Sequence, residues 1–194
     1  MKKYKSVLFK KHDLFDQSEN DDQKLLYRYE IKTIVDEVEY PDAQDLHILG
    51  LTYYETAKDE IDINEAHEYF LAALQENNNY YMARLYSAHC YHDNGDYESA
   101  LKDYLAVDGD LLKAEFPLWR FVKLQEQIGY CYHKLGKITE SKKYFNDILV
   151  FYQNEAYDEL VDPSEVYECL EETDPIYTNL KKIELKYYGN HENT

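Results

Sequence analysis

One apolar pattern recurs along the chain and constrains its fold more than any other feature of the sequence. Between Ile63 and Leu74, apolar side chains follow the i, i+3, i+4, i+7, i+8 spacing of a single buried helical face. The residues with this spacing are Ala66, Tyr69, Phe70, Ala73 and Leu74. Two later stretches repeat it with Tyr97, Ala100, Leu101, Tyr104 and Leu105, and with Ile138, Ser141, Phe145, Ile148 and Leu149. Each stretch follows another amphipathic segment and a short turn, which predicts three helix–turn–helix units in series.

The turns and the composition agree with an all-α chain. Gly95 and Gly136 stand in the second and third turns, where glycine can end a helix in a left-handed conformation. The whole chain of 194 residues contains only 6 Gly and 4 Pro, too few for an all-β protein built on tight turns. Three helical pairs in series indicate a helical repeat protein.

The three units resemble tetratricopeptide repeats, whose pattern is a large apolar residue, Leu-Gly, Tyr, and then Ala-x3-Phe in the second helix. The matching residues are Leu46, Leu49, Gly50, Tyr53, Ala66, Phe70 and Ala73, then Ala88, Tyr91, Gly95, Ala100 and Tyr104, then Ile128, Gly129, Tyr132, Gly136, Ser141 and Phe145. The resemblance covers residues 43–154 and is divergent, since Arg84 and Gln125 replace the large apolar residue and the closing Pro is missing.

The resemblance implies an α-solenoid of about three repeats with N- and C-terminal capping helices, within a single domain of residues 1–194. Residues 1–42 form an N-terminal segment and capping helix, with the helix at about 23–39 and residues 1–22 expected to be poorly ordered. Residues 43–154 hold the repeats. Residues 155–194 form an acidic C-terminal part with capping helices at about 164–172 and 176–188 and a poorly ordered tail from 189.

The formal charge of −18 restricts the partners that we expect. An acidic protein repels phosphate backbones and anionic membranes, so we expect neither nucleic acid nor membrane as a partner. Lys residues flank only a four-residue stretch, Ser6–Phe9, near the start, whereas a secretory signal needs an apolar run of roughly 7–15 residues. Cys90, Cys131 and Cys169 make an odd count, which favours free thiols and a cytoplasmic location.

A repeated Cys-Tyr-His sequence, at Cys90 and again at Cys131, raises the question of a metal or catalytic site. In the repeat register both Cys occupy equivalent positions where a small buried residue fits, so we interpret them as structural. A metal-dependent hydrolase that uses His89, His92, Asp93 and His133 is the enzymatic alternative. No Cys-x2-Cys, His-Glu-x2-His, phosphate loop or Gly-x-Ser-x-Gly accompanies them. We therefore expect a non-catalytic protein with no cofactor and no bound metal.

By the resemblance, the first helix of each pair lines a concave groove that binds a protein or a peptide. The residues that we expect to contact the partner are His47, Leu51, Tyr54, Met82, Leu85, His89, His92, Lys123, Glu126, Tyr130 and His133. The clamp that holds acidic chaperone tails in part of this family is not reproduced, because only Lys123 agrees with it. A groove in so acidic a protein favours basic or neutral ligands.

The segment from Asn146 to Leu180 has no Lys or Arg. Its acidic residues are Asp147, Glu155, Asp158, Glu159, Asp162, Glu165, Glu168, Glu171, Glu172 and Asp174, and its tyrosines are Tyr152, Tyr157, Tyr167 and Tyr177. Two interpretations stay open, a solvated helical face and a docking surface for a basic protein. The second leads to a specific alternative function, an immunity protein that neutralises a basic, nuclease-like toxin.

Overall fold

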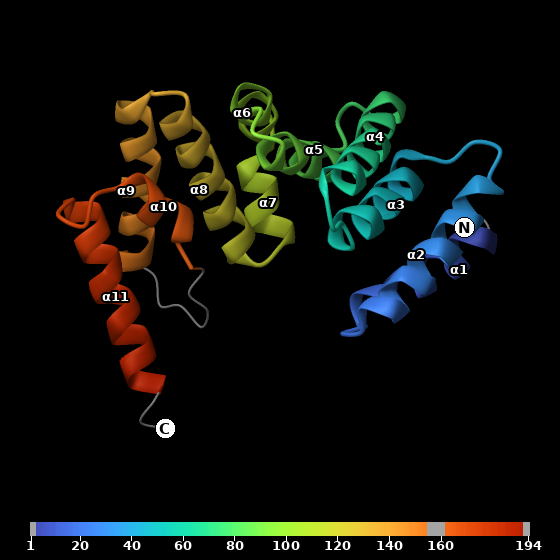
Figure 1. Cartoon of the computed structure of the whole chain (residues 1–194), viewed down its shortest axis with the longest axis horizontal. Coiled ribbons are helices and arrows are strands. Elements are labelled where there is room, and N and C mark those ends of the chain that lie inside the picture. The colour runs from blue at the N-terminus through green and yellow to red at the C-terminus, as the bar shows by residue number, and fades with distance from the viewer. Residues whose placement is uncertain (1–2, 155–161, 192–194) are drawn as a thin grey trace. The chain divides into compact units, whose positions relative to one another are not determined.

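The computed structural model describes residues 3–154 and 162–191, and its helices follow one another in the order shown in Figure 1. These described residues contain eleven α-helices and no β-strand, which confirms the all-α prediction. The chain divides into two compact units, residues 1–107 (unit 1) and 108–194 (unit 2). Unit 1 contains α1 (Lys3–Asp16), α2 (Asp21–Asp36), α3 (Ala43–Glu55), α4 (Glu60–Glu76), α5 (Tyr81–Asp93) and α6 (Tyr97–Leu105). Unit 2 contains α7 (Gly109–Glu115), α8 (Leu118–Lys134), α9 (Ile138–Asn154), α10 (Ser164–Cys169) and α11 (Pro175–His191).

In unit 1 the helices pack as successive pairs, α1 with α2, α3 with α4 and α5 with α6. Short polar side chains set the starts of these helices. The Asn20 carboxamide accepts from the Gln23 amide at α2, Asp42 makes a full capping box with Asp45 at α3, and Asp59 caps α4. Gly95, with φ of 76°, ends α5 in the left-handed region as its sequence position predicted.

The expectation that residues 1–22 are poorly ordered is wrong for residues 3–22, which the structure describes. Residues 3–16 form α1, whose Leu8 and Phe15 are fully buried against Ile31 and Val35 of α2. Leu8 and Phe15 are seven residues apart and therefore lie on one helical face. The Lys24 ammonium lies 4.9 Å from the centre of the Phe15 ring, so the basic residues of this region cover apolar surface.

The repeat pattern corresponds to a specific packing contact in both units. A Cβ atom placed on Gly50 would lie 2.6 Å from Cε1 of Phe70, and one on Gly129 would lie 2.5 Å from Cε1 of Phe145. Only glycine allows the two helices of each pair to approach this closely. Cys90 and Cys131 are fully buried, which confirms their structural interpretation.

In unit 2, α8 packs against α9, and α7, α10 and α11 pack on this pair. The connection before α8 contains α7, a helix that the sequence pattern did not predict. α10 packs on α8 and ends at residue 169, earlier than expected, and α11 packs on α9. Their apolar residues Val166, Leu170 and Leu180 join Phe145 and Ile148 of α9 in one buried cluster. The C-terminal helices therefore cap this pair.

Candidate functional site

The first set of predicted partner-binding residues meets in unit 1, where α3 and α5 are in contact. We define the α3/α5 face by His47, Leu51, Tyr54, Met82, Leu85, His89 and His92. Tyr86 lies at its centre, with its ring 5.6 Å from His47, 5.7 Å from Tyr54 and 5.5 Å from His89, measured between centroids. These rings meet edge to face, which is a favourable geometry for aromatic pairs.

Two short hydrogen bonds fix the polar groups of this face. The Tyr54 hydroxyl donates to Oδ2 of Asp93 at 2.6 Å, and Nδ1 of His89 lies 2.6 Å from the hydroxyl of Tyr104. Nδ1 of His92 lies 3.5 Å from Oδ1 of Asp93. Burial acts to raise the pKa of Asp93, but the hydrogen bonds from His92 and Tyr54 outweigh it and lower that pKa. Asp93 is therefore a stable anion at the edge of an aromatic face.

The predicted residues of this face differ in accessibility. His47 and Leu85 are buried, so they support the face, whereas Leu51, Tyr54, Met82, His89 and His92 are half-buried. Asp93 and Glu55, at the C-terminal ends of α5 and α3, are exposed. A ligand would therefore meet half-buried rings and methionine beside carboxylates.

The second set of predicted residues lies in unit 2, where α10 of the same chain covers it. We define the α8 face by Lys123, Glu126, Gln127 and Tyr130, which the i, i+3, i+4, i+7 spacing places on one side of α8. Gln127 donates from Nε2 to both carboxylate oxygens of Glu165, at 3.0 and 2.8 Å. The Tyr130 hydroxyl donates to Oε2 of Glu168 at 3.2 Å. Both glutamates belong to α10.

Glu126 is the buried centre of this contact, with only 1% of its surface exposed. Its Oε1 accepts the backbone N–H of Glu165 at 3.0 Å, which satisfies a donor at the start of α10 that has no partner within the helix. Its Oε2 lies 2.8 Å from Nζ of Lys123, and that ammonium is also 3.5 Å from Glu165. Burial raises the pKa of Glu126 although Lys123 acts against it.

The positive charge of Lys123 is therefore balanced by carboxylates of the same unit. Burial acts to lower the pKa of Lys123, but the carboxylates of Glu126 and Glu165 outweigh burial. The net result is a raised pKa, so the side chain stays charged. The one residue that agreed with the chaperone-tail clamp thus holds the protein's own α10. His133, the last predicted residue of α8, is half-buried one turn beyond Tyr130.

The structure gives no support to the metal or thiol chemistry that the Cys-Tyr-His repeat suggested. Within residues 3–154 and 162–191, no three His, Cys, Asp or Glu side chains are grouped to hold a metal ion. Burial raises the pKa of each of the three thiols, Cys90, Cys131 and Cys169, to about 12. These thiols are protonated near neutral pH, and a protonated thiol is a poor nucleophile.

The acidic segment contains both exposed and internally bound residues. Asp162, Glu168, Glu171 and Glu172 are exposed, whereas Asp174 pairs with Lys142 at 2.6 Å. Its described tyrosines pack within unit 2: Tyr152 is buried, and the Tyr167 hydroxyl donates to Glu184 at 3.1 Å. The Tyr167 ring lies 4.7 Å from that of Tyr177. Glu155, Tyr157, Asp158 and Glu159 lie outside the described residues.

Sequence reasoning missed two residues that organise these faces. Tyr86 was not among the residues expected to contact the partner, although its place one turn before His89 could have signalled its role. Glu165 has no signal in the sequence that links it to α8, because its partners are 38 and 39 residues away.

The fold is that of a TPR-like helical repeat α-solenoid. It is similar over 99% of the chain, with a TM-score of 0.74 and 14% identity, to the whole length of a crystallised variant of a putative kinesin light chain from Podosopora anserina with nearly identical TPR-like repeats. A second crystal structure of that protein matches 96% of this chain and 99% of its own, with a TM-score of 0.69 and 15% identity. No protein-family model and no curated protein sequence matches the chain.

The comparison confirms the predicted resemblance and fold class. None of the described helices combines the length and the apolar character that a membrane crossing requires.

Proposed function

We propose that the chain is a non-catalytic module that binds a protein or a peptide on the α3/α5 face of unit 1. The observation that carries the proposal is the arrangement around Tyr54, whose ring joins the His47–Tyr86–His89 cluster and whose hydroxyl holds the ionised Asp93. Rigid aromatic side chains beside a fixed charge are typical anchors of protein interfaces.

The charge of this face favours a basic or neutral ligand. Asp93 is an exposed carboxylate, Glu55 is exposed and pairs with Lys24 at 3.3 Å, and the chain as a whole carries a formal charge of −18. A Lys or Arg side chain of a partner could approach the ring of Tyr54 or Tyr86 as well as the carboxylates. Such a field raises the association rate with basic partners more than it raises affinity.

The contact between α8 and α10 is the reason that the proposed binding site is restricted to the α3/α5 face. Glu126 and Tyr130 form hydrogen bonds to α10, and the Lys123 ammonium lies between the carboxylates of Glu126 and Glu165, so a ligand could use these residues only by replacing that helix. A proposal that assigns partner binding to these three residues therefore requires α10 to leave α8. The α3/α5 face requires no such step.

The exposed carboxylates of the acidic segment favour one second candidate, an immunity protein for a basic toxin. Asp162, Glu168, Glu171 and Glu172 are all exposed in a stretch that has no Lys or Arg. A basic toxin that handles phosphate would present the complementary surface. In this candidate function, the partner binds α10 and its flanks and leaves the α3/α5 face untouched.

A charge-matched pair of variants tests the main proposal. The tagged protein captures partners from its native cells, and bound proteins are identified by mass spectrometry after washes at low and moderate salt. Met82→Lys places a cation on the α3/α5 face, whereas Leu105→Lys makes the same chemical change at a 47% exposed position on α6. We expect only Met82→Lys to lose the basic partner. Equal binding by both variants would contradict the α3/α5 site.

A second pair tests the immunity candidate. Glu171→Lys combined with Glu172→Lys reverses the exposed acidic segment, and Glu68→Lys combined with Glu76→Lys makes the same change on α4. The immunity function predicts one stoichiometric basic partner that survives moderate salt and that only the first double variant loses. If Met82→Lys alone removes the partner, the immunity candidate is excluded for that partner.

A further inference from the structure

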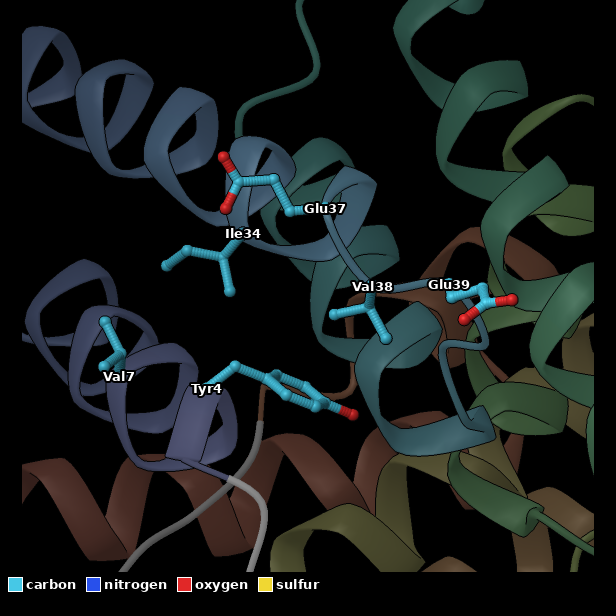
Figure 2. Close-up of a pocket in the computed structure, with 6 residues that line it drawn as sticks. All are labelled: Tyr4, Val7, Ile34, Glu37, Val38 and Glu39. Carbon is cyan, nitrogen blue, oxygen red and sulfur yellow. The ribbon is translucent and has the colours of Figure 1, made fainter.

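Unit 1 contains a surface pocket on the α1–α2 hairpin, and the α3/α5 face contributes no residue to it. Its volume is about 450 Å³, within the roughly 300–1,000 Å³ that is usual for ligand pockets. The residues that line it are Tyr4, Val7, Ile34, Glu37, Val38 and Glu39. Figure 2 shows Tyr4 and Val7 on α1 opposite Ile34 on α2 and Val38 just beyond the end of that helix.

A polar network around the buried carboxylate of Asp45 holds the Tyr4 wall of the pocket in place. The Tyr4 hydroxyl donates to Oδ2 of Asp45 at 2.8 Å, and Asp45 is fully buried. The Lys5 ammonium lies 3.0 Å from Oδ1 of the same carboxylate and 2.6 Å from Oδ2 of Asp42. These contacts fasten the start of α1 to the start of α3. The pocket is therefore pre-formed on one side by a fixed aromatic ring.

The floor of the pocket is apolar and accessible. Val7 is 47% exposed, and Ile34 and Val38 are half-buried. Val38 keeps its position because its backbone N–H donates to the carbonyl oxygen of Val35 at 3.0 Å, in the turn that ends α2. An apolar side chain of a ligand would exclude water from these three residues.

Two carboxylates without ion pairs stand at the rim. Glu37 and Glu39 are both exposed, and neither forms an ion pair with any residue in the described part of the chain. Neighbouring acids are neutralised in contrast, since Asp36 pairs with Lys32 at 2.6 Å and Glu30 with Lys11 at 2.7 Å. Among the cations of α1 that precede Val7, Lys5 is turned to Asp42 and Asp45, and Lys3 is exposed. The lining itself contributes two negative charges.

We propose that this pocket binds a protein segment in which one apolar side chain adjoins Lys or Arg. The apolar side chain occupies the space between Tyr4, Val7 and Ile34, and the basic side chains reach Glu37 and Glu39. Charge complementarity selects this occupant over an acidic segment. Tyr40, which is 76% exposed directly after Glu39, extends the surface that such a segment can contact.

The test is a titration of the full chain, labelled with ¹⁵N, followed by amide chemical shifts. The probe is the blocked peptide acetyl-Gly-Leu-Lys-Lys-Gly-amide. Its matched controls replace both Lys by Glu, or Leu by Ala. We expect saturable shifts at Val7, Ile34 and Val38 with the first peptide. Binding should be roughly tenfold weaker with the Ala peptide, because it loses most of the buried apolar area.

A matched pair of protein variants tests the charged rim. Glu37→Gln combined with Glu39→Gln should weaken binding of the Lys-containing peptide by roughly fivefold, as expected for two exposed ion pairs. Glu19→Gln combined with Glu76→Gln changes the net charge equally at exposed sites outside the pocket and should leave the affinity unchanged.

Three results would overturn the proposal. They are the absence of saturable shifts at the pocket up to millimolar peptide, equal binding of the Glu-containing peptide, and equal weakening by the two double variants. The pocket shares no residue with the α3/α5 face, so Met82→Lys should keep the saturable shifts at Val7, Ile34 and Val38. The pocket proposal can therefore be disproved while the proposed function of the α3/α5 face stands. Equally, the proposed function can be disproved while the pocket proposal stands.

Discussion

The α3/α5 face and the α8 face occupy the same position in the repeat pattern, but α10 of the same chain covers only the α8 face. On the α3/α5 face, Tyr54 and His89 contact Tyr86, and Asp93 stays exposed at the edge. On the α8 face, Glu126 and its neighbours bind a helix of the same chain. The difference shows that the position of a residue in a repeat sets the direction of its side chain, but a distant segment decides whether that side chain is available to a partner.

The α10 helix depends on the face that it covers. It has only six residues, Ser164–Cys169, and helices this short are not stable alone in water. Its helical state therefore requires the hydrogen bonds from Gln127 and Tyr130, the Glu126 carboxylate that accepts from its backbone, and the burial of Val166. Disrupting the α8 face should release α10, whereas disrupting the α3/α5 face should leave the helix pairs of unit 1 folded.

The largest expected effect concerns the glycine–phenylalanine contact that both units contain. Gly129→Ala and Gly50→Ala would each place a Cβ within 2.6 Å of a buried phenylalanine ring. Overpacking of this kind lowers the free energy of unfolding by about 1–3 kcal/mol. Urea unfolding followed by circular dichroism measures the change.

Gly95→Ala is the control for those variants, because a Cβ there meets no atom within 4 Å but the residue has φ of 76°. Its cost should be about 1 kcal/mol from backbone strain alone. If Gly129→Ala and Gly50→Ala have the same free energy of unfolding as the wild type, the close packing described for both helix pairs is wrong.

The second prediction separates the two faces by releasing α10. Glu126→Ala removes the acceptor for the Glu165 amide and a partner of Lys123, and should cost about 2 kcal/mol because part of this network is buried. Burial raises the pKa of the Cys169 thiol to about 12, and this burial is lost when α10 leaves α8. Iodoacetamide should then modify Cys169 faster in the variant than in the wild type.

Cys90 is the internal control for this experiment, because it is buried in α5 of unit 1. Glu126→Gln is the matched variant, since its carboxamide oxygen can still accept from the Glu165 amide, and it should have the smaller effect. Unchanged alkylation of Cys169 in Glu126→Ala would contradict the dependence of α10 on Glu126.

The third prediction concerns pH and the α3/α5 face. The pKa of Asp93 is lowered in the folded protein, so its ionised form stabilises the fold at pH values above its unfolded pKa. This contribution disappears as the pH falls through the lowered pKa. Asp93→Asn should therefore lower the free energy of unfolding by about 1 kcal/mol at neutral pH. The difference between the two proteins should vanish in acid.

Urea unfolding of both proteins from pH 7 down to pH 3 measures this difference. Asp108→Asn, which also changes an exposed aspartate but at the cap of α7, is the control for the loss of one charge. A difference for Asp93→Asn that persists unchanged at pH 3 would mean that Asp93 acts through packing and not through its charge.

The smallest expected effect compares one hydroxyl on each face. Tyr130→Phe loses a 3.2 Å hydrogen bond to the exposed Glu168, and Tyr54→Phe loses a 2.6 Å bond to Asp93. We expect about 0.5 kcal/mol for the first and about 1 kcal/mol for the second. Partner capture should weaken only with Tyr54→Phe. Equal loss of the partner with Tyr130→Phe would place the binding site on the α8 face.

The sequence by itself determined the helical pairs and the burial of two cysteines. These features follow from spacings of three, four and seven residues within one helix, which fix a side chain's face without reference to the rest of the chain. Cys90 and Cys131 are therefore buried, as the repeat pattern predicted.

Only the tertiary structure decided which predicted binding residues are accessible, and it also revealed α1 and α7 as ordered helices. Leu8 and Phe15 order α1 by packing on α2, and Glu165 covers α8 through partners that are 38 and 39 residues distant. Contacts at such separations depend on where two helices meet after folding. No local spacing encodes that meeting, so the occupant of the α8 face could not be read from the repeat.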